Sequence, residues 1–159
     1  MKRRSKKRET RARKERGWRQ MAEIVGTGLY ALPESFRNGL VKLRRNGLPD
    51  SEIVRAYERC GAWLAKAKNG IGECECGCGT KCPVDAVNAQ GNSIWHLDHD
   101  KHRKTFRGIL FERCNREIGD GTRKLAHVGY VLAHEARLPS ESAFVRDRNE
   151  FLASGATPD

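Results

Sequence analysis

Four cysteines fall within a short run near the middle of the chain, and this run constrains the fold more than any other feature. The segment from Cys74 to Cys82 reads Cys-Glu-Cys-Gly-Cys-Gly-Thr-Lys-Cys, and a further cysteine, Cys114, follows downstream. Glycines let the backbone turn tightly around an ion, and cysteine thiolates are favoured zinc ligands. The pattern therefore predicts a zinc ion held by thiolates.

A disulfide framework is the competing explanation for so many cysteines. Cysteines two apart in the sequence cannot easily bridge, and nothing in the sequence suggests export to an oxidising compartment. A small body with few aromatic residues also gains folding energy from a structural metal. Zinc is therefore favoured, and Cys60, on a predicted helix, is expected to be a buried apolar residue.

The length and hydropathy of the chain exclude several classes of protein. It has 159 residues, of which 38% are hydrophobic, and this suits one domain with a separate tail. No stretch approaches the roughly 18 apolar residues that cross a bilayer, and no charged-then-apolar leader opens the chain. We expect neither a membrane protein nor an exported one.

The positive charge is concentrated at the amino terminus. Residues 1–20 hold 11 of the 31 Lys and Arg residues but only 2 of the 20 acidic ones, so the rest of the chain is nearly neutral. This arm has almost no apolar residue before Trp18, and we predict that it is disordered in isolation. Its expected role is to neutralise the phosphates of a polyanion, and a solubilising or nuclear-targeting run is the alternative. The first cations of the arm are Lys2, Arg3, Arg4, Lys6, Lys7 and Arg8.

Residues 30–68 show apolar spacing that predicts two or three short helices. Pro33 and Pro49 each precede acidic and serine residues, which is typical of a helix start, and Asn46-Gly47 marks a break. Because Arg44 and Arg45 lie near that break, a helix-turn-helix DNA reader is one interpretation. Structural packing is the other and the more general one.

The segment after the cysteine run predicts a strand, a loop, a second strand and a helix. Residues 94–100 alternate, residues 101–105 are polar and basic, residues 106–111 form the second strand, and a helix begins at Glu112. This unit places an aspartate, a histidine and an asparagine, namely Asp98, His99 and Asn115, where they could converge on one cleft. Further helices are predicted over residues 123–137 and from about residue 140 toward Leu152.

These residues resemble a known family. Asp98-His99-Asp100, then Phe106-Arg107-Gly108-Ile109-Leu110, then Cys114-Asn115-Arg116-Glu117-Ile118-Gly119, resemble the recombination endonuclease VII branch of the HNH (ββα-metal) nucleases. The resemblance covers about residues 63–136, roughly half of the chain. Its strength lies in three motifs in register, preceded by a cysteine cluster.

The resemblance implies roles for particular side chains. Asp98 and Asn115 match the metal-binding aspartate and asparagine, which would hold one Mg²⁺ or Mn²⁺ ion, and oxygen ligands suit such a hard cation. His99 matches the general base, and Arg107 is a candidate phosphate-positioning residue. The implied reaction is hydrolysis of a phosphodiester, leaving a 5′-phosphate and a 3′-hydroxyl. Taken singly, Asp98-His99 could be a turn with a supporting histidine and Asn115 a helix cap.

The chain also departs from the family pattern. The family builds its zinc site from two Cys-x-x-Cys pairs, and here Phe111 replaces the first cysteine of the second pair. Either three clustered cysteines join Cys114, or the four clustered cysteines hold zinc alone. The candidate ligands are thus four of Cys74, Cys76, Cys78, Cys82 and Cys114. A carboxylate found in some relatives is also replaced, since Ile118 occupies its place.

Together these observations predict an α+β protein with a zinc-stabilised ββα-metal (HNH, His-Me finger) core, flanked by short helices and a disordered basic arm. The predicted parts are the arm (1–20), a helical subdomain (21–68), the nuclease core (69–122) and C-terminal helices (123–159). We expect a phage-type DNA endonuclease in the host cytoplasm, with DNA as partner, no small-molecule substrate, and a homodimer left open. The alternatives are a non-catalytic zinc-stapled nucleic-acid-binding or packaging accessory protein, and a structural adaptor.

Overall fold

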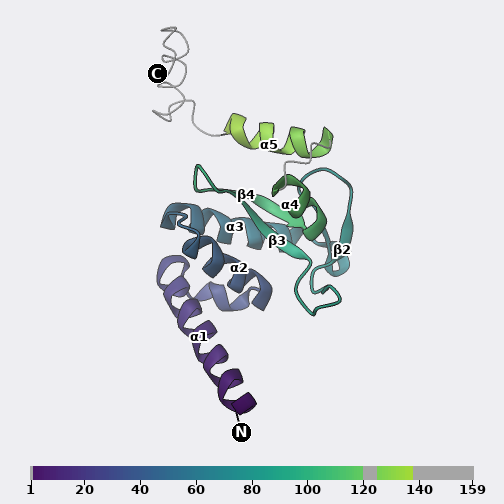
Figure 1. The fold of residues 1–159 in the computed structure, drawn as a ribbon. Helices are drawn as coiled ribbons and strands as arrows, with labels where there is room; N and C mark the ends of the chain where they lie inside the picture. The colour runs from purple at the N-terminus through teal and green to yellow at the C-terminus, as the bar shows by residue number, and fades with distance from the viewer. Residues whose placement is uncertain (1, 120–124, 138–159) are drawn as a thin grey trace, which may run out of the picture.

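The computed structural model describes residues 2–119 and 125–137, and within them the chain is α+β, with five α-helices and two small antiparallel sheets (Figure 1). The elements in chain order are α1 (Lys2–Val25), the 3₁₀ helix η1 (Thr27–Ala31), α2 (Glu34–Arg45), α3 (Asp50–Lys66), the 3₁₀ turn η2 (Lys68–Gly70), β1 (Ile71–Glu73), β2 (Lys81–Pro83), β3 (Trp95–Asp100), β4 (Thr105–Phe111), α4 (Glu112–Gly119) and α5 (Leu125–Arg137).

Helices α2 and α3 begin and end where the sequence predicts. Pro33 and Pro49 are the residues that precede them. Acidic side chains occupy both first turns, where their negative charge interacts favourably with the positive end of the helix dipole. Helix α2 ends at Asn46, and Gly47 adopts a φ of 87°, a left-handed conformation that glycine adopts without a Cβ penalty. The predicted break between the two helices is confirmed.

The predicted hairpin is also confirmed, with one irregularity in its register. Strands β3 and β4 pair antiparallel, with Asp98 opposite Gly108 and His99 opposite Phe106. Arg107 is therefore the extra residue of a β-bulge on β4. A bulge bends its strand and redirects the side chain it carries, and this one directs Arg107 onto Asp98.

Helices cover both faces of this hairpin (Figure 1). Helices α2 and α3 lie on one face, where Glu52 of α3 accepts a hydrogen bond from the Phe106 backbone N–H. Helices α4 and α5 lie toward the other face, where Tyr130 and His134 of α5 reach residues of the strands. Within the described residues β3 pairs with β4 alone, so its other edge carries no strand.

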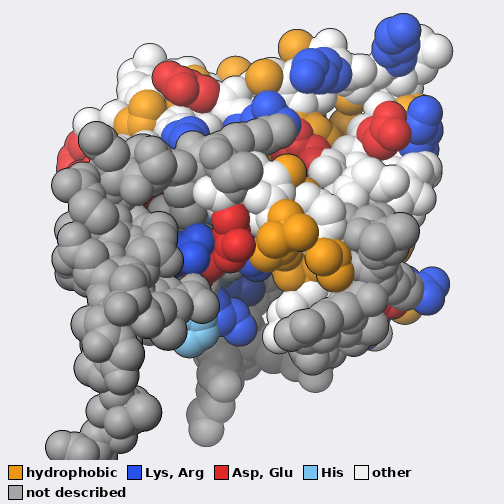
Figure 2. Space-filling model, turned by 90° about the horizontal axis from the view of Figure 1, so that it is seen from above, with side chains coloured by type: hydrophobic (Ala, Val, Ile, Leu, Met, Phe, Trp, Pro, Cys, Tyr) orange, Lys and Arg blue, Asp and Glu red, His pale blue; other side chains and the backbone are white. Residues whose placement is uncertain are grey.

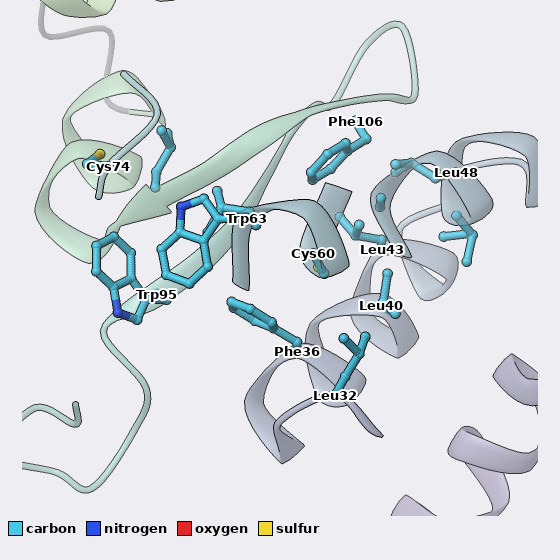
Figure 3. Packing of buried hydrophobic residues seen from close by; sticks show 14 of the residues in the cluster. Leu32, Phe36, Leu40, Leu43, Leu48, Cys60, Trp63, Cys74, Trp95 and Phe106 are labelled. Carbon is cyan, nitrogen blue, oxygen red and sulfur yellow. The ribbon is translucent and has the colours of Figure 1, made fainter. Parts of the chain in front are cut away.

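The core joins the helical part of the chain to the hairpin through aromatic rings (Figure 3). Phe36 of α2 meets Trp63 of α3 with ring centroids 5.6 Å apart, and Trp63 meets Trp95 of β3 at 4.8 Å, both edge to face. Each such pair contributes about 0.5–1.5 kcal/mol beyond the area it buries. Cys60 lies in this core with no exposed surface, so the prediction of a buried cysteine there is confirmed.

The prediction of a disordered N-terminal arm is wrong, because Lys2–Val25 forms one continuous helix, α1. The C-terminal part of α1 packs on the body: Met21 is buried, and Trp18 donates a hydrogen bond to Asn38 of α2 at 3.0 Å. A packed end supplies the costly helix nucleus, and Arg, Lys, Glu and Ala then extend the helix at little cost. The first turns of α1 project away from the body (Figure 1).

The small sheet of β1 and β2 is a feature that the sequence did not predict. Its strands are three residues long, and Gly72 on β1 lies against the ring of Trp63, where a Cβ would have no room. Helix α5 confirms the predicted helix before Pro139, whereas the helix predicted from about residue 140 lies outside the described residues. Within the described residues, no helix is both long and apolar enough to cross a bilayer.

Candidate metal centre and adjoining cleft

Four thiols converge between the small sheet and the first turn of α4. The Sγ atoms of Cys74, Cys76, Cys78 and Cys114 all lie within 4.8 Å of one another, with Cys74 to Cys76 at 3.4 Å and Cys78 to Cys114 at 3.6 Å. A tetrahedral zinc ion with bonds of about 2.3 Å requires a similar spacing between sulfurs. This cluster could bind a metal such as zinc.

The cluster decides between the two ligand sets that the sequence left open. Cys82 lies on β2 opposite Gly72 and is not part of the group, so three clustered cysteines join Cys114. Gly77 and Gly79 adopt φ values of 82° and 77° between the ligands, as the tight-turn argument predicts. All six cysteines are free thiols, so the described chain contains no disulfide.

The environment of the thiols favours a bound cation. Burial raises the pKa of Cys114 to about 12, and it raises the pKa of Cys74 as well. Burial also opposes the Cys78 thiolate, but hydrogen bonds with Thr80, Cys76 and Cys114 outweigh it and lower that pKa to about 7. A metal that takes the charge of the thiolates removes the burial penalty. The Phe111 backbone N–H already donates to the Cys74 sulfur at 3.3 Å.

A cleft of about 1170 Å³ runs beside the hairpin, and all three predicted catalytic side chains line it. Asp98 and His99 come from β3, and Asn115 comes from α4, next to the thiol of Cys114 in the sequence. The opposite wall is formed mainly by α2. Side chains alternate between the faces of a strand, but a cleft along an open strand edge can receive side chains from both.

Asp98 is buried and accepts hydrogen bonds from two neighbouring side chains. Arg107 donates to both of its oxygens, from Nε to Oδ2 at 2.9 Å and from Nη2 to Oδ1 at 3.1 Å, and the Tyr130 hydroxyl donates to Oδ2 at 3.2 Å. Burial opposes the charge of Arg107, but Asp98 outweighs it and the pKa of the guanidinium is raised. The predicted phosphate-positioning residue is therefore the counter-ion of the predicted metal ligand.

His99 is half-buried, and its Nε2 lies 3.3 Å from Nδ2 of Asn46, the residue that ends α2. Burial lowers the pKa of His99; Asp98 opposes this shift, and Arg107 adds to it. The imidazole is thus held neutral at lower pH than a free histidine, which is the form that accepts a proton. The Asn46 carbonyl also accepts a hydrogen bond from Lys104 Nζ at 3.0 Å, so the turn after α2 is fastened to the hairpin loop.

The donor set has room for a magnesium-type ion. A carboxylate offers about four lone-pair sites, and three of those on Asp98 are occupied by Arg107 and Tyr130, which leaves one on Oδ1. Asn115 also lines the cleft and carries an amide oxygen. A magnesium-type ion keeps several water ligands, so one or two protein oxygens would suffice to hold it.

The cations predicted to contact DNA at the amino terminus lie in the first two turns of α1, and their side chains lie outside the part of the chain that the structure describes. Sequence reasoning missed three side chains around the cleft, namely Lys42, Asn46 and Tyr130. Asn46 precedes His99 by 53 residues, and no local spacing predicts such a contact.

Comparisons of the chain with protein-family models, curated proteins and solved structures found no match.

Proposed function

We propose that this protein is a divalent-metal-dependent DNA endonuclease of the ββα-metal type. The observation that carries the proposal is that Asp98, His99 and Asn115 all line one cleft, on a hairpin followed by a helix. The thiol cluster supports it, because Cys114 holds the first turn of α4 and thereby the neighbouring Asn115.

The residues of the cleft have separate roles in the proposed reaction. Nδ2 of Asn46 lies against Nε2 of His99, so the amide donates to that nitrogen and the neutral ring carries its hydrogen on Nδ1. Nε2 is therefore the basic nitrogen, and the attacking water would replace the Asn46 amide there and give up its proton. A cation held by Asp98 and Asn115 would supply charge stabilisation at the phosphate.

The bond changes follow from these positions. The water oxygen bonds to phosphorus as His99 takes its proton, and the bond from phosphorus to the 3′ oxygen breaks. That oxygen takes a proton from a solvent water, and His99 then returns its proton to the solvent. The products are a 5′-phosphate and a 3′-hydroxyl. Tyr130 and Arg107 hold the Asp98 carboxylate in place, and Arg107 itself lines the cleft.

Nicking of supercoiled plasmid tests the proposal. We expect the zinc-loaded protein to nick with Mg²⁺ and not without it, and His99→Ala to lower the rate by about 10²–10⁴-fold, the usual contribution of a general base. Zinc content and melting temperature of the variant serve as folding controls. Added imidazole is expected to restore part of the lost rate. A fully active His99→Ala protein contradicts the proposal.

One observation favours the alternative, a zinc-stapled protein that binds nucleic acid without cutting it. Arg107 already neutralises Asp98, so the carboxylate needs no cation to be satisfied. DNA that is retarded but uncut, by wild type and His99→Ala alike and with or without Mg²⁺, would support this alternative.

A further inference from the structure

Helix α2 presents a row of polar side chains to the cleft. Asn38, Lys42 and Asn46 all line it, and they follow one another at intervals of four residues. Side chains four apart lie on the same face of a helix, and at 1.5 Å per residue these three span about 12 Å. The wall opposite the predicted catalytic residues is therefore a straight polar stripe.

The ends of this stripe are held in place. Asn38 Oδ1 accepts the hydrogen bond from Trp18, the Asn38 amide donates to Glu34, and Asn46 is held against His99. Gly39 brings the helix close to β3, because a Cβ there would lie 2.9 Å from the Leu97 side chain. The stripe and the strand are thus fixed relative to each other by packing.

Two lysines that line the cleft form no ion pair with the described residues. Lys14 pairs with Glu34 at 2.8 Å and Arg107 pairs with Asp98 at 2.9 Å, whereas Lys42 and Lys101 have no carboxylate partner among the described residues. Lys42 lies close enough to His96 to lower its pKa, although burial is the larger cause.

Lys101 also lowers the pKa of His99, and burial is again the larger cause. Lys42 of α2 and Lys101 of the hairpin loop both line the cleft. Asp85 and Asp100 are the carboxylates of the cleft that form no ion pair in the described residues, and Asp100 accepts hydrogen bonds from the backbone N–H groups of His102 and Arg103.

The shape and donors of the cleft indicate a polymer. Its volume of about 1170 Å³ lies just above the roughly 300–1,000 Å³ typical of small-molecule sites, and its α2 wall carries Lys42 between two amide side chains. N–H donors and lysines position a phosphate backbone without reading bases. In contrast, Figure 2 shows that on the end of the molecule seen from above the described Lys and Arg side chains lie scattered among acidic and apolar ones.

We infer that the α2 stripe binds the sugar-phosphate backbone of one DNA strand, with Lys42 contacting a phosphate next to the one that faces His99. The inference rests on the proposed function for the identity of the polymer, but binding in the cleft does not require cleavage. It assigns to α2 a role in holding substrate and not in reading sequence.

The test compares two single substitutions on the same helix in the full-length protein. Lys42→Ala removes the cleft lysine, and Arg45→Ala removes an exposed cation that does not line the cleft. Binding of a fluorescent 20-base-pair DNA duplex is measured by anisotropy over a range of salt, with Ca²⁺ in place of Mg²⁺ to prevent cleavage. Lys42→Arg is the conservative variant.

We expect Lys42→Ala to weaken binding by about fivefold and to reduce the slope of log K against log salt by about 1, the value for one lost phosphate contact. Arg45→Ala is expected to change affinity by less than about twofold, and Lys42→Arg to retain the slope. Equal effects of Lys42→Ala and Arg45→Ala would overturn the inference, because they would indicate diffuse attraction.

The binding assay separates this inference from the proposed function. If wild type binds but never nicks, and Lys42→Ala still binds more weakly than Arg45→Ala, the strand site stands and the nuclease proposal fails. If wild type nicks and Lys42→Ala binds and nicks normally, the nuclease proposal stands and the strand site is refuted.

Discussion

Burial and several neighbouring charged groups set the pKa of His99. Burial lowers its pKa below the ordinary value of 6.5, Asp98 opposes that shift, and Arg107, Lys101 and Lys104 add to it. A general base works only when neutral, so the nicking rate is expected to fall with acidity below pH 6.5 and to be constant above it. Asn46 adds no charge, although its amide touches the ring.

Replacing that amide by a carboxylate gives a prediction with a definite sign. Asn46→Asp places a negative charge about 3.3 Å from Nε2, which favours the imidazolium and raises the pKa of His99. The acid limb of the nicking rate should therefore move to higher pH, and Asn38→Asp, two helical turns away, should move it less. The same shift should appear when His99 is titrated by NMR, and an unmoved titration would show that Asn46 does not touch the ring in solution.

Single residues also show which parts of the site the sequence could predict. Asp98, His99 and Asn115 line one cleft, as their places along the strand, loop, strand and helix pattern predict, whereas their roles stay predictions. Asn46 and Lys42 were not, because they come from a helix whose contact with β3 depends on tertiary packing. The bulge at Arg107 was also beyond prediction, since the strand pattern continues unbroken through it.

At the scale of elements, the thiol cluster allows a comparison between two cysteines that the sequence could not distinguish. Cys114→Ser removes one of four converging ligands and is expected to lose zinc and to lower the melting temperature, because metal binding contributes folding free energy. Cys82→Ser lies outside the cluster and should retain one zinc per chain, with a change in the free energy of unfolding below about 1 kcal/mol. Zinc content by atomic absorption and thermal melts provide the measurement.

The opposite result would identify a different ligand set. If Cys82→Ser lost zinc while Cys114→Ser kept it, the four clustered cysteines would hold the metal alone. The sequence left both sets open because a run of alternating Cys and Gly does not specify which sulfurs face inward. The same lack of an apolar pattern explains why strands β1 and β2 were missed.

Helices and strands outside this run were predictable for local reasons. Proline followed by acidic residues marked the starts of α2 and α3, and alternating apolar residues marked β3. The sequence does not predict helix α1, because low hydrophobicity indicates a disordered segment. What that argument lacked was the packing of Met21 and Trp18, which fixes one end of the helix.

At the scale of the whole molecule, the charge of α1 should determine how binding responds to salt. Changing the first six cations to glutamine removes up to six phosphate contacts, so the slope of log K against log salt should fall by up to about 5. The six are Lys2, Arg3, Arg4, Lys6, Lys7 and Arg8. Anisotropy titrations of wild type and variant measure the slope, and circular dichroism checks the helix content. An unchanged slope would assign the arm to solubility or targeting.

The position of Cys114 beside Asn115, at the start of α4, has a practical consequence for anyone who purifies this protein. The two side chains share one helical turn. A molecule that loses an ion bound by the thiols would therefore also lose the support that positions Asn115 in the cleft. Specific activity would then report the fraction of intact molecules in a preparation rather than the turnover of each one. Batches that differ in chelator exposure or oxidation should differ in apparent rate, while their rates per bound zinc agree.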